Sequence, residues 1–314
     1  MRKLSFAVAA TIFGAIGSAS AQTYPSQPIT MLVGYAVGGP SDTIARIMAD
    51  RMKVTLGQPV IIENVTGAGG SIGTGRVARS APDGYTLVLG HNQTHVINAV
   101  TQNLQYDVVK DFEPVTLVAD TPQWLVARKT LPADDTKSFI AWLKQQDGKA
   151  TSGTVGVGGP ADLAAAFFQK ATATKFQLVP YRGGAPLVQD MLAGQIDFTF
   201  GQAANYLGHV RSGTLKPYAV LAKKRWWAAP EVPTMDEAGV TGLDASFWHG
   251  LWAPKGTPKE IIARLNAAMV ETLADETVKK RMADIGQEGW PVDRQNPAAL
   301  AAQQKTEIER WWPV

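Results

Sequence analysis

Two short glycine-rich segments carry the residues best suited to binding chemistry. The first is Gly38-Gly39-Pro40-Ser41-Asp42 and the second is Gly158-Gly159-Pro160-Ala161-Asp162. Each follows an apolar stretch typical of a buried strand and precedes a helical pattern. A helix N-terminus offers unpaired backbone N–H groups and a partial positive charge, and glycine lets a ligand approach that backbone closely. The two segments therefore predict two helix starts that hold an anion between them.

A second group of candidate ligand contacts consists of His91, Asn92 and Thr94. They directly follow the apolar stretch Tyr85–Gly90, which predicts a strand. Ligands of open α/β sheets bind at the carboxyl ends of strands, so we expect these polar side chains at the site. His91 and His95 are four residues apart, but no third metal ligand follows at a useful spacing, and no metal site is expected.

Arg182 and an aromatic segment complete the candidates. Arg182 follows the predicted strand Phe176–Tyr181. A guanidinium binds a carboxylate through two parallel hydrogen bonds, although an ion pair within the protein explains Arg182 equally well. Phe247 and Trp248 lie on another predicted strand, and we expect them to line a cleft.

Catalysis by Ser71 is an alternative to binding. Gly69-Gly70-Ser71-Ile72-Gly73 matches the G-x-S-x-G pattern of serine hydrolases, so the chain could be an exported serine esterase. A nucleophile elbow turns sharply off its strand, whereas six residues separate Val65 from Ser71. The partners available to Ser71 are His209 or His249 as the base and Asp197 or Asp236 as the orienting acid.

Residues 1–21 have the features of a cleaved export signal. Arg2 and Lys3 form a basic start, Phe6–Ile16 is apolar, and Ala19-Ser20-Ala21 consists of small residues. The apolar stretch is too short to span a bilayer. We therefore expect an exported protein whose mature chain begins near Gln22.

Composition excludes several classes of function. The chain has no cysteine, which excludes disulfides, thiol catalysis and thiolate metal sites. Its formal net charge is +3, without a basic stripe, so no nucleic-acid partner is expected. No cofactor is expected either. The length of 314 residues favours two domains.

Strand-like and helix-like segments alternate along the chain, which predicts α/β layers with mostly parallel sheets. The predicted helices are Leu163–Thr172, Ala185–Ala193, one opened by a capping box at Thr257-Pro258-Lys259-Glu260, Asp275–Ile285, and one from Asn296-Pro297 to Trp311. The predicted strands are Ile29–Ala36, Val60–Val65, Tyr85–Gly90, Val115–Ala119, Trp124–Arg128, Ala150–Val157, Phe176–Tyr181, Ile196–Gly201, Leu215–Ala222 and Phe247–Ala253.

Together these motifs resemble the Bug family of periplasmic solute-binding proteins, which serve tripartite tricarboxylate transporters. The resemblance covers nearly all of the mature chain. It rests on the order and intervals of Tyr24-Pro25 with Pro28-Ile29, Gly38–Asp42, Glu63-Asn64 with Gly67–Gly73, Pro82-Asp83-Gly84-Tyr85-Thr86-Leu87, Lys110-Asp111-Phe112, Val179-Pro180-Tyr181-Arg182-Gly183, Gly194-Gln195-Ile196-Asp197, Pro230-x-Val232-Pro233-Thr234 with Glu237-Ala238-Gly239, and Ala253-Pro254-x-Gly256-Thr257-Pro258.

The resemblance implies an α/β, two-domain type II periplasmic-binding-protein fold with a ligand cleft between the domains. Domain 1 would comprise residues 22–122 plus 248–314, and domain 2 residues 123–247. The expected partners are a small carboxylate ligand and the membrane subunits of a tripartite tricarboxylate transporter. The protein is expected to be a monomer and not an enzyme. A sensor that reports to a membrane kinase is an alternative to transport.

The family's two binding loops map to Tyr35 with Gly39–Asp42 and to Gly158–Ala161. Pro40 has no N–H to donate, and the second loop has no hydroxyl. Asp42 is expected to cap its helix. The neutral second loop and the neighbouring aromatic residues favour a dicarboxylate, with terephthalate as an aromatic candidate. Polar contacts are therefore expected from Ser41, His91, Asn92 and Thr94.

Overall fold

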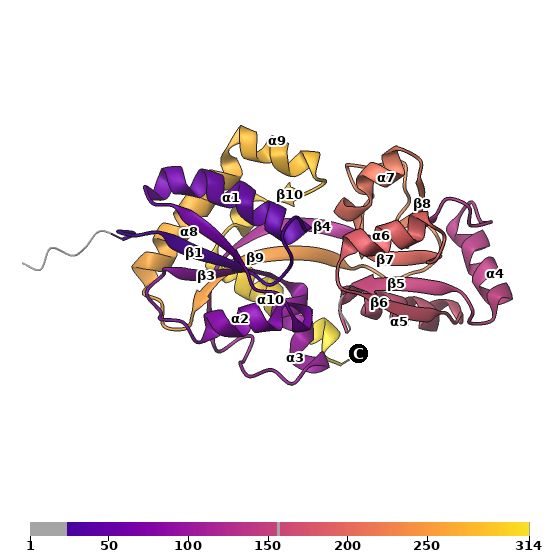
Figure 1. Ribbon diagram of the computed structural model, residues 1–314, viewed down its shortest axis with the longest axis horizontal. Coiled ribbons are helices and arrows are strands. Elements are labelled where there is room, and N and C mark those ends of the chain that lie inside the picture. The colour runs from indigo at the N-terminus through magenta and orange to yellow at the C-terminus, as the bar shows by residue number, and fades with distance from the viewer. Residues whose placement is uncertain (1–23, 156–157, 314) are drawn as a thin grey trace, which may run out of the picture.

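The chain forms two lobes that lie side by side, as Figure 1 shows for a computed structural model that describes residues 24–155 and 158–313. The predicted export signal, residues 1–21, and the last two residues of the predicted strand Ala150–Val157 lie outside the described residues. The chain crosses between the lobes in two long strands, β4 (Phe112–Arg128) and β9 (Ser246–Pro254).

Strand β4 belongs to both lobes because it changes partners along its length. From Phe112 to Pro122 it pairs with β9, and from Gln123 to Arg128 it pairs with β7 (Phe198–Gln202) and β8 (Leu215–Leu221). Strands β10 and β8 pair with β4 beside the main path of the sheet. That path runs β2 (Val60–Asn64), β1 (Ile29–Val33), β3 (Thr86–His91), β9, β4, β7 (Phe198–Gln202), β5 (Thr151–Val155), β6 (Gln177–Tyr181), with β8 at Leu215–Leu221 and β10 at Glu288–Gly289.

The prediction of mostly parallel sheets is wrong. Strands β1, β2 and β3 pair in parallel, as do β5, β6 and β7, but every pairing of β4 and β9 is antiparallel. The alternation of strand-like and helix-like segments predicts the parallel βαβ units within each lobe. It does not predict that β4 and β9, which cross between the lobes, pair in antiparallel fashion. β4 contains both of the predicted strands Val115–Ala119 and Trp124–Arg128. Pro122 does not interrupt it, because Pro122 lies where the pairing with β9 ends and no hydrogen bond of the sheet is lost through its missing N–H.

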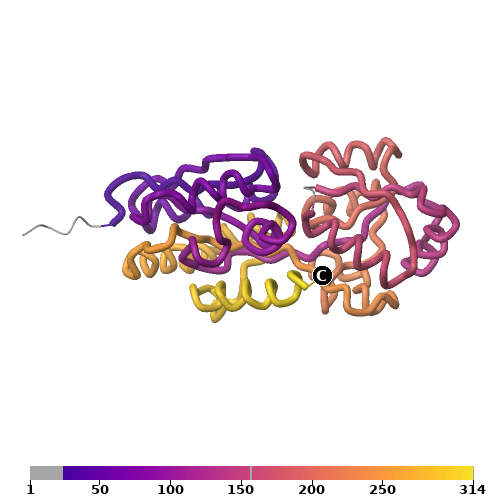
Figure 2. The backbone as a smooth tube through the Cα atoms, turned by 90° about the horizontal axis from the view of Figure 1, so that it is seen from below, coloured from indigo at the N-terminus to yellow at the C-terminus, as the bar shows by residue number. Residues whose placement is uncertain are grey.

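Helices cover both faces of the sheet in each lobe. Figure 2 shows the C-terminal helices beneath lobe 1, with α10 reaching the junction. Lobe 2 carries α4 (Thr136–Gln146), α5 (Pro160–Thr172), α6 (Gly184–Leu192) and α7 (Leu207–Arg211). Lobe 1 carries α1 (Pro40–Leu56), α2 (Ser71–Ala78), α3 (Asn98–Thr101), α8 (Lys259–Ala274), α9 (Glu276–Asp284) and α10 (Pro297–Trp311). Short helical turns lie at Ala68–Gly70, Gln93–Ile97, Ala203–Asn205 and Val292–Arg294.

Side chains cap the starts of α9 and α10, whereas no side chain of the described residues caps the start of α8. The Asp275 carboxylate accepts from the N–H groups of Thr277 and Val278 at the start of α9, and Asn296 caps α10 in the same way. The predicted capping box at Thr257 is wrong. The Thr257 hydroxyl donates to the carbonyl of Pro254 at 2.7 Å, and α8 begins only at Lys259.

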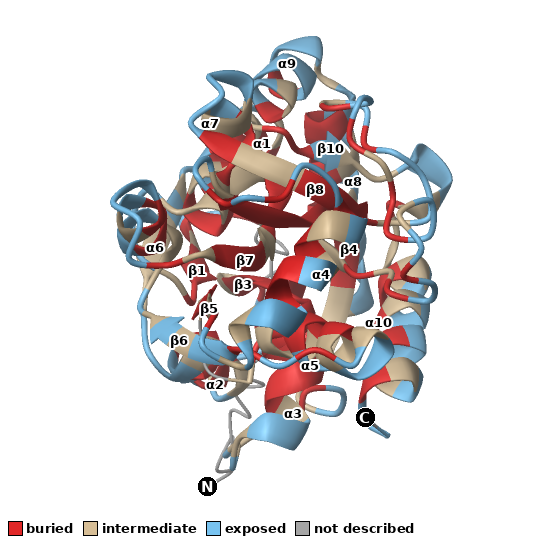
Figure 3. Cartoon of the chain, turned by 90° about the vertical axis from the view of Figure 1, so that its right-hand side faces the viewer, coloured by how far each residue is buried: buried red, intermediate tan, exposed pale blue. Residues whose placement is uncertain are grey.

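Figure 3 shows buried residues along the strands and on the inward faces of the helices. The core of lobe 2 contains an aromatic group formed by Phe139, Phe168, Phe198 and Phe200. Burial of each such ring stabilises the fold by about 1.5–3 kcal/mol. The buried cluster that contains these rings continues into lobe 1, where it includes Leu32, Val88 and Trp252. Over residues 24–155 and 158–313, no helix has the length and apolar character needed to cross a bilayer.

Candidate functional site

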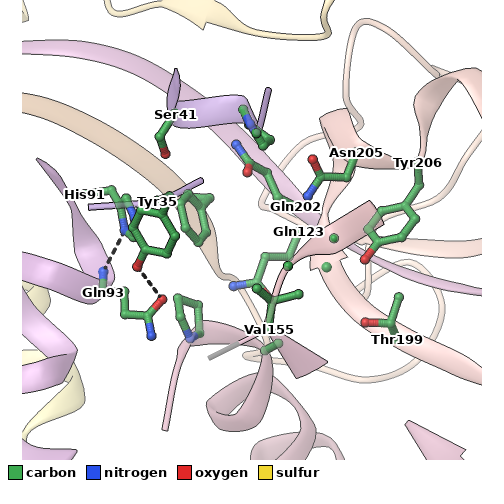
Figure 4. A pocket seen from close by; sticks show the side chains of 18 of the residues that line it. Tyr35, Ser41, His91, Gln93, Gln123, Val155, Thr199, Gln202, Asn205 and Tyr206 are labelled. Atoms are coloured by element: carbon green, nitrogen blue, oxygen red, sulfur yellow. Dashed lines mark hydrogen bonds between the residues drawn. The ribbon is translucent and has the colours of Figure 1, made fainter. Parts of the chain in front are cut away.

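A cavity of about 130 Å³ lies between the two lobes (Figure 4). One buried water requires about 10–15 Å³ on the same scale, so the cavity accommodates a small organic molecule. Nine residues expected at the site line it: Tyr35, Gly39, Pro40, Ser41, His91, Pro160, Ala161, Arg182 and Phe247.

Three helices, α1, α5 and α6, begin at the cavity. Their N-cap residues are Gly39, Gly159 and Gly183, and no side chain of the described residues caps any of them. Backbone N–H groups of the first turns are therefore available to a ligand, in line with the positive ends of the helix dipoles. The starts of α1 and α5 were predicted from the sequence and that of α6 was not, although Gly183-Gly184 before the predicted helix Ala185–Ala193 carries the same signal.

The same hydrogen bond, from a glycine N–H to an aspartate four residues later, stabilises both glycine loops. The N–H of Gly38 donates to Asp42 Oδ2 at 2.9 Å, and the N–H of Gly158 donates to Asp162 Oδ2 at 2.6 Å. Both glycines have a left-handed backbone, with φ of 81° and 70°, which other residues adopt with strain. Each aspartate thus holds the loop ahead of its helix. Gly158 and Gly159 shape the second loop without lining the cavity.

Asp42 fixes the first loop and does not cap α1 as expected. Besides Gly38, it accepts hydrogen bonds from Arg46 at 2.9 Å and from Asn64 at 3.0 Å. Burial alone would raise the pKa of this carboxyl, but these hydrogen bonds outweigh burial and lower it. Asp42 is therefore an ionised structural group.

Three rings form one wall of the cavity. The ring of His91 lies between those of Tyr35 and Phe247, with centroid distances of 4.8 and 4.5 Å. Burial lowers the pKa of His91 well below its usual value, and the nearby His249 adds to this, so the ring is neutral. The wall is therefore aromatic and uncharged, with its rings tilted by 35° and 44° to one another.

The Ser41 hydroxyl lies 3.0 Å from Nε2 of His249, and both residues are buried. Burial lowers the pKa of His249 to about 3, so this imidazole is also neutral. The contact holds the hydroxyl of Ser41 at the start of α1, where it lines the cavity.

Asn92, Thr94 and Trp248 do not line the cavity. Asn92 donates to the carbonyl of Ser246 at 2.9 Å, and the Thr94 hydroxyl bonds the backbone of His91. Side chains alternate along a strand, so Trp248 faces the core while its neighbour Phe247 faces the cavity. All three support the residues around the cavity.

The catalytic arrangement proposed around Ser71 is not assembled. The Ser71 hydroxyl donates to the carbonyl of Ala68 at 2.7 Å and lies 2.9 Å from Oε1 of Gln102. Of its two candidate bases, His249 contacts Ser41 and His209 contacts Thr214. Ser71 is a helix-start residue without a base.

Several lining residues were missed from the sequence. Thr199–Gln202 lie at the carboxyl end of the predicted strand Ile196–Gly201, so the rule used for His91 would have found them. Gln123 falls in the interval between two predicted strands and carried no signal. The remaining lining residues that were not predicted are Ala36, Gln93, Val155, Gly183, Gly184, Asn205 and Tyr206.

The charges around the cavity favour an anion. None of its described lining residues is an aspartate or glutamate, and Arg182 is the cation among them. Arg182 is exposed and joins none of the ion pairs found between described residues. Among the described residues, no cluster of three or more histidine, aspartate or glutamate side chains is suited to a metal ion.

Two α/β lobes around a cavity are the arrangement of a solute-binding protein. A model of the tripartite tricarboxylate transporter family receptors matches residues 44–312. The protein BugT of Bordetella pertussis is 36% identical over 300 residues, which cover 95% of this chain and 91% of BugT. The chain therefore belongs to this receptor family, the Bug family, as the sequence predicts.

Solved structures confirm the predicted fold. MatC from Rhodopseudomonas palustris with bound malate superposes with a TM-score of 0.86 at 37% identity, covering 92% of this chain and 98% of MatC. Another R. palustris protein, solved with adipate, gives a TM-score of 0.86 at 30% identity, with 92% and 96% covered. The fold is the two-domain α/β fold of periplasmic binding proteins.

Proposed function

We propose that this receptor binds a small dicarboxylate in the cavity between its lobes and delivers it to the membrane subunits of a tripartite tricarboxylate transporter. The observation that carries the proposal is the convergence of three uncapped helix starts and Arg182 on a cavity whose described lining has no carboxylate. The malate bound to MatC and the adipate bound to the second R. palustris protein support a dicarboxylate.

One carboxylate of the ligand meets the start of α1, where the Ser41 hydroxyl and first-turn N–H groups donate to it. The distal carboxylate meets the starts of α5 and α6, with Arg182 beside it. The body of the ligand lies against the rings of Tyr35, His91 and Phe247. The aromatic ring of terephthalate is one such body, because it can pack against these rings.

Binding couples to closure of the lobes. The lobes act as two domains, residues 22–122 with 248–314 and residues 123–247, joined where β4 changes partners. A ligand that contacts both domains binds the closed state more tightly than the open state, so it shifts the population towards closure. The closed form then presents a surface to the membrane subunits.

The remaining assignments follow from this role. Removal of residues 1–21 leaves a periplasmic monomer that needs no cofactor, binds no nucleic acid and turns over no substrate. The predicted site residues act as ligand contacts where they line the cavity, and as supports where they do not.

A thermal-shift screen of the mature protein against mono-, di- and tricarboxylates tests the proposal. A ligand at a hundredfold excess over its Kd adds about 2.7 kcal/mol to the free energy of unfolding, so a binder raises the melting temperature. The expected result is a shift with dicarboxylates such as malate, adipate or terephthalate. No shift with any of them, or turnover of an ester reporter, would contradict it.

A further inference from the structure

A glutamine without hydrogen-bond partners lies on the cavity wall. Gln123 is 1% exposed, and neither its Nε2 nor its Oε1 has a hydrogen-bond partner among the described residues. It is the residue at which β4 enters lobe 2, and Figure 4 shows it among the residues that line the cavity.

A second unpartnered amide lies next to Gln123. Gln202 of β7 is directly opposite Gln123 in the antiparallel register, so both side chains project from the same face of the sheet. Gln202 also lines the cavity and is 8% exposed, and its Nε2 lacks a partner among the described residues. Two buried amides therefore offer hydrogen bonds at one place.

Proteins pair nearly all of their buried polar groups, because an unpaired one loses its hydration without compensation. A pair of such groups in a binding cavity indicates that the ligand supplies the partner. The donors on the two Nε2 atoms match an acceptor, and the carbonyl of Gln123 matches a donor. A carboxylate only accepts, so it leaves the Gln123 carbonyl unpaired.

We propose that the amides of Gln123 and Gln202 bind a hydroxyl group of the ligand, and that the receptor therefore prefers a hydroxylated dicarboxylate to its unsubstituted analogue. A hydroxyl donates to Oε1 of Gln123 and accepts from an amide N–H at the same time. This inference rests on the proposed function, since the helix starts and Arg182 hold the carboxylates. Because the amides are uncharged, they select among dicarboxylates without supplying the attraction for the anion.

Calorimetric titration of the mature protein with succinate and with each enantiomer of malate tests this role. We expect one malate enantiomer to bind at least about tenfold more tightly than succinate, since a site built for a hydroxyl rejects the analogue that lacks it. In Gln123→Met, which keeps the length of the side chain, the ratio of the two affinities falls to about twofold or less. Gln202→Met reduces the ratio in the same direction.

Gln287→Met is the matched control. Gln287 is also buried with both amide atoms unpartnered among the described residues, but it does not line this cavity. This variant should keep the wild-type ratio. Equal affinity for malate and succinate in the wild type, or an unchanged ratio in a folded Gln123→Met, would overturn the inference. Absence of binding by both ligands, with no other dicarboxylate bound, would instead contradict the proposed function.

Discussion

Replacement of Gly39 by aspartate should weaken dicarboxylate binding about a hundredfold or more while leaving the fold intact. Gly39 is the N-cap of α1, lines the cavity and has φ of −74°, which any residue adopts. An added Cβ would meet only the carbonyl oxygen of Ala36 within 4 Å, at 3.3 Å. The substitution therefore places a carboxylate at the helix start with little strain.

The expected loss follows from Coulomb's law. Two unit charges about 5 Å apart at an effective dielectric constant of about 20 repel by roughly 3 kcal/mol. That free energy corresponds to a loss of affinity of about a hundredfold or more. Gly39→Asn is the control, because asparagine has the same shape, caps a helix as well as aspartate and carries no charge.

Calorimetric titration of both variants with the tightest dicarboxylate measures the difference. The melting temperatures of the ligand-free variants should agree within about 2 °C, since the two residues cap equally well and the Arg46 guanidinium offsets the charge of Asp42. Equal affinities in Gly39→Asp and Gly39→Asn, with both folded, would refute the placement of the ligand carboxylate at the start of α1.

Three further outcomes are expected. Arg182→Gln should weaken dicarboxylate binding about threefold to tenfold. It should also reduce the salt dependence of the association rate, measured by stopped flow at two ionic strengths. Unchanged binding would place the distal carboxylate elsewhere. Gly34→Ala should destabilise the fold by about 1–3 kcal/mol in urea denaturation, because its Cβ would lie 2.7 Å from the Cα of Gly70, whereas Gly208→Ala, with open space around it, should not. The free energy of unfolding, measured by denaturation at several pH values, should fall as the pH drops below about 6.5. It should fall by about 1.4 kcal/mol per pH unit for each histidine that is protonated in the unfolded chain but not in the folded chain. The histidines are His95 and His249, whose pKa burial lowers to about 3, and His91, whose pKa burial lowers well below its usual value. Burial raises the pKa of Asp120 to about 6, so the folded chain binds one proton there and the loss of stability is smaller by that proton. Equal stability at pH 7 and pH 5 would contradict this sign.

The glycine loops were predictable because local chemistry decides them. A strand, a glycine pair, a proline at the first helical position and an aspartate two residues later are all visible in the sequence, and the structure places both loops at the cavity. Their order along the chain also carried the family resemblance. Phe247 and Trp248 were both expected at the cavity, but only Phe247 lines it, because side chains alternate along β9 and Trp248 faces the core.

Gln123 and its placement beside Gln202 were not predictable, although Gln202 itself directly follows the predicted strand Ile196–Gly201. Gln123 and Gln202 lie opposite each other only because β4 and β7 pair across the lobe, and no local pattern specifies that register. Asn92 and Thr94 were expected at the ligand because they follow a strand, but their side chains bond the backbone of the same region. A polar residue after a strand serves either purpose, and the choice depends on tertiary contacts.

A crystal structure of the mature protein with its tightest dicarboxylate tests the central claim most directly. One carboxylate should lie within hydrogen-bond distance of the Ser41 hydroxyl and the first turn of α1, and the other should contact the starts of α5 and α6. A ligand that contacts only one lobe, or that binds outside the cavity between them, would contradict the account.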